Sequence, residues 1–150
     1  MYSRILVPLD GSATSQRGLE EALALAHSLQ SSLHLLNVVD ARMLLGEAGA
    51  YAPQQLLDDW HAAGTQLIGV ALELARSKGV AVDGVVRCDP GARICDMIVR
   101  EAKDCKAELI VMGTHGRRGL RRLTLGSDAE LVLRDSPVPV MLVRDPGSPA

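Results

Sequence analysis

Two patterns of apolar residues alternate along the chain. Short, mostly apolar runs occupy residues 5–9, 33–39, 80–87, 109–112 and 138–143, and such runs are typical of strands buried in a sheet. Between these runs, apolar residues return every three or four positions, which predicts helices with one apolar face. Strands that alternate with helices predict an α/β domain whose strands are parallel.

The first two helical segments carry signals for where they begin and end. Ser12 or Thr14 is expected to cap the first helix. The apolar stripe of this helix consists of Leu19, Ala22, Leu23, Ala26 and Leu29. In the second helix, Pro53 suits the first turn and Gly79 suits the end. The stripe of the second helix consists of Leu56, Trp60, Ala63, Leu67, Ala71 and Leu74.

Two further helices and one loop complete the pattern. Asp89 and Pro90 are expected to cap and open the third helix. This helix would bury Ile94, Met97, Ile98 and Cys105. The fourth helix is expected over residues 126–134, and residues 40–52, which lack any period, predict a mobile loop. Five strands and four helices in this order predict an open, doubly wound α/β sheet.

Composition narrows the class of protein. A chain of 150 residues suits one domain, and 47% hydrophobic residues suffice for a proper core. With no Phe, one Trp and two Tyr, that core must be aliphatic, as suits a parallel sheet covered by helices. The net charge of −2 and the scarcity of aromatic stacking residues argue against nucleic-acid binding.

Several other classes of site and location are disfavoured. No segment approaches the length of a membrane span, and the apolar run before Asp10 is too short for a signal peptide, so we expect a cytoplasmic protein without membrane contact. The cysteines and histidines follow no ligand spacing, which argues against a disulfide framework or a zinc site. Residues 145–150 contain two prolines and a glycine, and we expect them to form a disordered tail after a domain of residues 1–144.

The stretch that follows the fourth predicted strand carries the clearest chemical signal. Glycines stand at Gly113, Gly116 and Gly119, and four arginines follow or separate them: Arg117, Arg118, Arg121 and Arg122. Gly126 and Ser127 then stand where a helix is expected to begin. Glycines allow a ligand close to the backbone, and helix starts favour anions, so this combination predicts a phosphate site. Alternatively, Ser127 and Glu130 form a capping box, the glycines serve turns and the arginines are solvated.

The spacing of these glycines resembles a known signature. Gly113, two residues, Gly116, nine residues and then Gly126-Ser127 is similar to the nucleotide-binding motif of the universal stress protein family, in the form associated with its ATP-binding members. The runs ILVPLDGS at residues 5–12, NVVD at 37–40 and SPVPVMLV at 136–143 extend the resemblance over nearly the whole chain. The resemblance implies the strand order 3-2-1-4-5, so the order would reverse between the strands that end at Asp10 and Gly113. Ligands of open α/β sheets bind at such reversals.

The resemblance also implies the contacts of an adenine nucleotide. The residues expected on the adenine and ribose side are Pro8, Asp10 and Val38. Those expected along the ribose and phosphates are Gly113, Thr114, His115, Gly116, Arg117 and Arg118, with Gly126 and Ser127 on the terminal phosphates. Asp10 could also help to hold Mg²⁺ with the nucleotide, or could simply be a turn residue, and Val38 could simply be buried in the sheet.

Two positions depart from the pattern of the nucleotide-binding relatives. Cys88 and Asp89 stand where a glycine and an apolar or acidic residue are frequent, which puts the space near the ribose in question. Asp128 follows Ser127 where a small apolar residue is frequent, and its charge would repel a triphosphate at close range. Arginines or a metal ion could offset this repulsion, so the site would favour metal-bound ATP, or ADP or AMP.

The sequence supports three functional hypotheses. The first is a cytoplasmic, ATP-binding stress-response regulator, and the second is a slow ATPase or autophosphorylating enzyme, for which His115 and Asp128 are the nearby candidate bases. The third is an interaction protein that binds no nucleotide. No Walker motif, dinucleotide fingerprint or nucleophile elbow is present, which disfavours catalysis. In each case the apolar strand at residues 138–143 would lie at a sheet edge, which predicts a homodimer, as the resemblance also implies.

Overall fold

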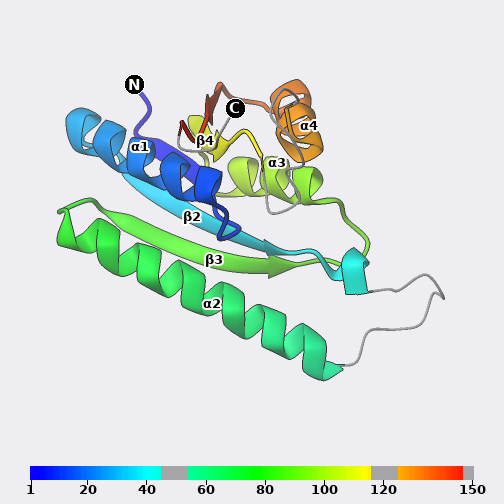
Figure 1. The fold of residues 1–150 in the computed structure, drawn as a ribbon. Coiled ribbons are helices and arrows are strands. Elements are labelled where there is room, and N and C mark those ends of the chain that lie inside the picture. Colours follow the sequence, from blue (N-terminus) through cyan, green and yellow to red (C-terminus); the bar gives the residue numbers. More distant parts are fainter. Residues whose placement is uncertain (45–53, 116–124, 147–150) are drawn as a thin grey trace.

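The computed structural model describes residues 1–44, 54–115 and 125–146 (Figure 1). Its strands are β1 (Arg4–Pro8), β2 (Ser32–Val39), β3 (Val82–Cys88), β4 (Leu109–Gly113) and β5 (Val140–Val143). They form one sheet in the order β3-β2-β1-β4-β5, and all four neighbouring pairs are parallel. The predicted fold class and strand order are therefore confirmed.

Helices cover both faces of the sheet. They are α1 (Ala13–Leu29), α2 (Gln54–Ser77), α3 (Ile94–Asp104) and α4 (Ser127–Asp135). One core cluster joins α1 and α2 to side chains such as Val7, Leu35 and Val111, and the other joins α3 and α4 to Leu6, Leu36 and Ile110. Figure 1 shows α2 lying along β3 and α4 beside α3. None of the helices in these ranges is long and apolar enough to cross a membrane.

The helix signals are partly confirmed. Ser12 is the N-cap of α1, and its side chain accepts a hydrogen bond from the backbone N–H of Ser15, so Ser12 rather than Thr14 is the cap. Gly79 follows α2 with a φ of 73°, which is a left-handed conformation that glycine adopts without strain. Pro53 lies outside the described residues. In the predicted loop at residues 40–52, a short 3₁₀ helix occupies Ala41–Leu44, and residues 45–52 lie outside the described part.

The expected start of α3 is wrong. The helix begins at Ile94 with Arg93 as its N-cap, five residues after Asp89. The Asp89 side chain instead accepts a hydrogen bond of 2.9 Å from the backbone N–H of Gly91, and it also pairs with Arg100 at 3.2 Å. Aspartate bonds its own backbone in turns as readily as it caps helices, and here the turn prevails.

The expected apolar stripe of α2 is displaced. Of the predicted stripe only Ala71 is fully buried, whereas Leu56 and Ala63 are exposed and Trp60 is half-buried. The other buried residues of this helix are Gly64, Ile68 and Ala75. The predicted Leu67 and Leu74 pack against the core only in part. Small residues prevail on the buried side because α2 lies very close to β2 and β3: a Cβ at Gly64 would come within 2.3 Å of Asn37 Oδ1.

Candidate functional site

The carboxyl ends of β1, β2 and β4 meet the start of α4 around one large pocket, with a volume of about 660 Å³. It lies where the strand order reverses between β1 and β4, as open α/β sheets place their ligands. The sequence-predicted residues that line it are Pro8, Asp10, Val38, Gly113, Thr114, His115, Gly126, Ser127 and Asp128. Gly116, Arg117 and Arg118 lie outside the described residues.

The turn from β1 into α1 positions Asp10. Asp10 Oδ1 accepts a hydrogen bond of 2.8 Å from the backbone N–H of Ser12, and Gly11 between them has a φ of 83°. Asp10 is therefore a turn residue, which was one of the two roles that the sequence suggested for it. Asp10 also lines the pocket, so the turn holds it at the edge where the ribose contact is predicted.

Gly113 is required by packing within the protein. A Cβ at this position would lie 2.6 Å from Thr14 Oγ1 and 2.7 Å from the backbone carbon of Thr14, so only glycine fits against the first turn of α1. The Thr14 hydroxyl donates a hydrogen bond to the carbonyl of His115, which ties α1 to the segment after β4. The backbone N–H of Gly126 donates to the Thr114 carbonyl at 2.8 Å, and this bond brings the start of α4 back to the end of β4.

The start of α4 forms one wall of the pocket. Gly126 is the N-cap and makes no side-chain cap, and Ser127 is already the first helical residue, so the alternative of a Ser127 capping box is wrong. Gly126, Ser127 and Asp128 all line the pocket. The first N–H groups of a helix and its dipole attract anions, so this wall suits a phosphate. Asp128 in the first turn offsets part of that attraction.

Sequence reasoning missed one side of the pocket. Trp60, Gly64 and Leu67 of α2 line it, as does Asn37 of β2. The Asn37 side chain is buried, and its Nδ2 donates a hydrogen bond of 2.8 Å to the Leu9 carbonyl. A buried-type run that is interrupted by an amide at its carboxyl end was the available signal for Asn37. Trp60 was expected in the core stripe, and nothing in its spacing distinguishes a core position from a pocket position.

The departures at Cys88 and Asp89 do not narrow the pocket, because neither residue is among those that line it. Burial and the neighbouring carboxylates of Asp89 and Asp40 raise the pKa of the Cys88 thiol, which therefore stays protonated near neutral pH. Within the described ranges, no group of three or more His, Cys, Asp or Glu residues could hold a metal ion. A Mg²⁺ ion at Asp10 would therefore need oxygen ligands from a nucleotide as well.

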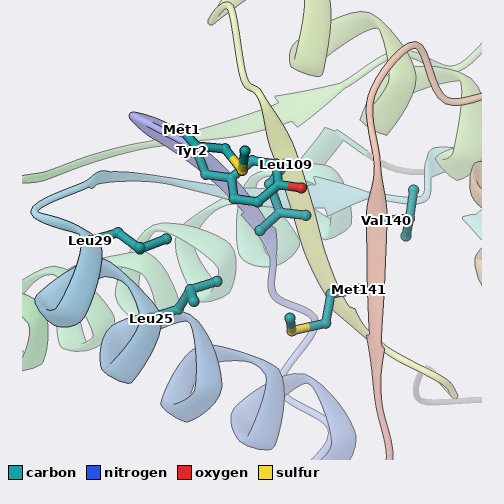
Figure 2. A pocket seen from close by; sticks show the side chains of 7 residues that line it. All are labelled: Met1, Tyr2, Leu25, Leu29, Leu109, Val140 and Met141. Carbon is teal, nitrogen blue, oxygen red and sulfur yellow. The ribbon is translucent and has the colours of Figure 1, made fainter.

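A second hollow, of about 570 Å³, lies at the opposite end of the sheet (Figure 2). It is lined by Met1, Tyr2, Leu25, Leu29, Leu109, Val140 and Met141. Apart from the Tyr2 hydroxyl, the side chains drawn there carry no hydrogen-bonding group, so this hollow is not suited to a phosphate. Met141 of β5 is 40% exposed beside it.

A charged cluster ties α3 to the sheet, on the face opposite α1 and α2. Glu101 of α3 accepts hydrogen bonds from His34 Nε2 at 2.8 Å and Arg87 Nε at 2.9 Å. His34 Nδ1 also contacts Asp83, which pairs with Arg4 at 2.7 Å. Burial alone would raise the pKa of both carboxyls, but the hydrogen bonds from arginine and histidine outweigh it and lower the pKa of Glu101 and of Asp83. None of these five residues lines the large pocket, so their role is structural.

Comparison with known proteins finds relatives in one family, the universal stress proteins. The model of the universal stress protein family matches residues 1–144. A universal stress protein of Methanocaldococcus jannaschii is 30% identical over 97% of this chain and 84% of its own length. One from Bacillus subtilis is 31% identical over 96% of this chain and 100% of its own length.

Solved structures agree with this placement. A universal stress family protein of Burkholderia pseudomallei has a TM-score of 0.78 at 32% identity, over 95% of this chain and 96% of that one. The protein MJ0577, also a universal stress protein of M. jannaschii, has a TM-score of 0.84 at 26% identity, over 99% of both chains. Two universal stress proteins of the same fold were solved with dAMP and with cAMP, at 20% and 24% identity.

Proposed function

Because this chain belongs to the universal stress protein family, we propose that it is a cytoplasmic regulator of the stress response that binds ATP, or ADP or AMP, at the carboxyl end of its sheet. The observation that carries the proposal is the pocket itself. It extends over the ends of β2, β1 and β4 and is closed by the start of α4. Family members with the same fold hold the adenine nucleotides dAMP and cAMP, which supports an adenine nucleotide as the ligand.

The phosphates would lie between the glycine loop and α4. The N-terminus of α4 would supply backbone N–H groups there, and the sequence that contains Gly116, Arg117 and Arg118 would supply cations. Asp10 at the end of β1 would face the ribose or a Mg²⁺ ion bound to the phosphates. That ion would also offset the charge of Asp128, so we expect Mg²⁺ to strengthen ATP binding.

Calorimetric titration of nucleotide-stripped protein tests this proposal. ATP, ADP and AMP are titrated with and without Mg²⁺ into the parent and into Gly116→Val, which places a branched side chain in the glycine loop. Gly69→Ala is the matched control, because a Cβ at Gly69 meets nothing within 4 Å. Binding that is lost in Gly116→Val and retained in the control would support the proposal. The absence of any adenine nucleotide binding to the parent would refute it and favour an interaction protein.

The same samples separate binding from catalysis. Phosphate release from Mg²⁺ATP, or incorporation of phosphate at Ser127, would indicate the slow enzyme instead of a pure regulator. His115 lines the pocket, and its Nδ1 lies 2.9 Å from Thr114 Oγ1. The variant His115→Ala therefore tests whether this histidine supports hydrolysis. We expect the protein to bind nucleotide without hydrolysing it over multiple turnovers. Nucleotide occupancy would then change the protein surface that a partner protein recognises.

We also propose that the protein is a homodimer joined through β5. This strand is the last in the sheet order and begins at Val140, two residues later than its apolar run predicts. Apolar edges need a cover, and the hollow in Figure 2 extends the apolar surface next to β5. Sedimentation at micromolar concentration should show twice the chain mass of 16.0 kDa. Met141→Lys should release the monomer, and a parent that sediments only as a monomer would refute the dimer.

A further inference from the structure

One wall of the large pocket is made by α2. Trp60, Ala63, Gly64 and Leu67 lie three or four positions apart, so they share one face of the helix, and all four line the pocket. Trp60 is the only tryptophan of the chain, and it is half-buried. Two of the other three residues on this face, Ala63 and Gly64, are very small. This wall therefore brings one aromatic residue to the pocket beside residues that fill little space.

The floor below this wall is a carboxamide held in place. Asn37 is 8% exposed, and its Nδ2 is anchored to the Leu9 carbonyl at 2.8 Å. Its Oδ1 lies against Gly64, where a Cβ would approach it to 2.3 Å, so α2 rests directly on the amide. Because the amide is held by Leu9 and lies against Gly64, this part of the pocket is formed before any ligand binds. A carboxamide can both donate and accept, as the edges of a heteroaromatic base require.

The strand order sets the direction of a bound nucleotide. In the sheet, β1 lies between β2 and β4. Helix α2 packs on β2 and β3, Asp10 follows β1, and Gly126 at the start of α4 is hydrogen-bonded to Thr114 just after β4. A nucleotide whose phosphates lie at α4 would cross β1 with its ribose and reach the α2 wall with its base. This arrangement puts the only tryptophan where the base ends.

We propose that Trp60 stacks on the base of the bound nucleotide. The inference rests on the proposed function, because it takes the phosphate position from there. Stacking of a base on an aromatic side chain strengthens binding by about 5- to 150-fold. Trp60 is then a determinant of nucleotide affinity that contacts the ligand, although it lies more than fifty residues before the glycine loop.

The test compares a nucleotide with a ligand that lacks a base. Mg²⁺ATP and inorganic tripolyphosphate are titrated by calorimetry into the parent, Trp60→Leu, Trp60→Phe and His61→Leu. Trp60→Leu should bind ATP about 5- to 150-fold more weakly and bind tripolyphosphate as the parent does. Trp60→Phe should retain most of the ATP affinity. His61 is exposed on the same helix and does not line the pocket, so His61→Leu is the matched control and should match the parent. In the parent, ATP should change the fluorescence of Trp60, and tripolyphosphate should leave it unchanged.

The possible failures are distinguishable. Equal weakening of ATP and tripolyphosphate in Trp60→Leu would mean that Trp60 only supports the fold, which overturns the inference. Undiminished ATP binding by Trp60→Leu would place the base elsewhere, for example against Ile94 and Ile98 on the α3 side, and overturns the inference while the proposed function stands. A parent that binds neither ligand overturns both proposals.

Discussion

Removing the charge of Glu101 should destabilise the protein far more than removing a surface carboxylate. The Glu101 side chain is only 5% exposed and accepts hydrogen bonds from His34 and Arg87. Glu101→Gln keeps the volume of the side chain, but the neutral amide cannot balance the charge of Arg87. Its NH₂ group would also have to face one of the two donors, His34 or Arg87. Breaking a buried ion pair costs about 3–5 kcal/mol. Because Arg87 is 50% exposed and partly screened by water, we expect a smaller loss of about 2–3 kcal/mol.

Thermal and urea denaturation of the two proteins measure this loss. For a domain of this length, about 2–3 kcal/mol lowers the melting temperature by roughly 4–12 °C at neutral pH. The matched control is Asp96→Asn, which breaks the solvent-exposed pair of Asp96 with Arg93 on the same helix and should melt close to the parent. A Glu101→Gln variant that melts with the parent at neutral pH would refute the assignment of Glu101 as the buried anchor of α3.

The pH dependence of the difference supplies an independent check. The pKa of Glu101 is lowered in the folded protein below its ordinary value of 4.5, so its contribution to stability is fully present above about pH 4.5. That contribution is lost as the pH falls through the folded pKa, where Glu101 takes up its proton. The stability difference between parent and Glu101→Gln should therefore shrink as the pH is lowered below 4.5. A difference that stays constant to pH 2 would show that ionisation of Glu101 is not its source.

Three further outcomes test other contacts. Gly113→Ala should lower the free energy of unfolding, measured in urea, by about 1–3 kcal/mol, because its Cβ would lie 2.6 Å from Thr14 Oγ1 and 2.7 Å from the Thr14 backbone carbon. An unchanged denaturation midpoint would contradict this close approach. Gly69→Ala should instead raise the free energy of unfolding by about 0.4–1 kcal/mol, because Gly69 is helical and a Cβ there meets no other atom within 4 Å. A loss of stability would contradict the open space at this position. Asn37→Leu should destabilise the protein by about 1–3 kcal/mol, because the Leu9 carbonyl loses its buried donor; equal melting temperatures would contradict that bond.

The repeating pattern of the chain predicted the α/β class with parallel strands. The mostly apolar runs at residues 33–39 and 109–112 are largely buried strands, as expected of a sheet covered on both sides, although His34 and Asn37 in the first run are polar. The alternation with helices then required parallel strands and crossovers, and the family resemblance implied the order of strands. Local signals failed where two local structures compete: Asp89 forms a turn instead of a helix cap, and Gly126 rather than Ser127 caps α4.

The large pocket could be predicted from the sequence only in part. Gly113, Gly126 and Ser127 were found because a glycine loop before a helix start is a local signal for phosphate, and all three line the pocket. Their spacing did not reveal that Gly113 is also required by the packing of Thr14 against it.

Only the tertiary structure decided what lies opposite the glycine loop. Trp60 and Asn37 come from segments whose sequence gives no sign of a shared surface, and they meet because α2 packs closely on β2 through Gly64. The same holds for Glu101 and His34, which are 67 residues apart and form one buried pair. A periodic pattern specifies which side of an element is buried. The partner that the element meets there depends also on the close fit of side chains distant in sequence, and only the folded chain determines that fit.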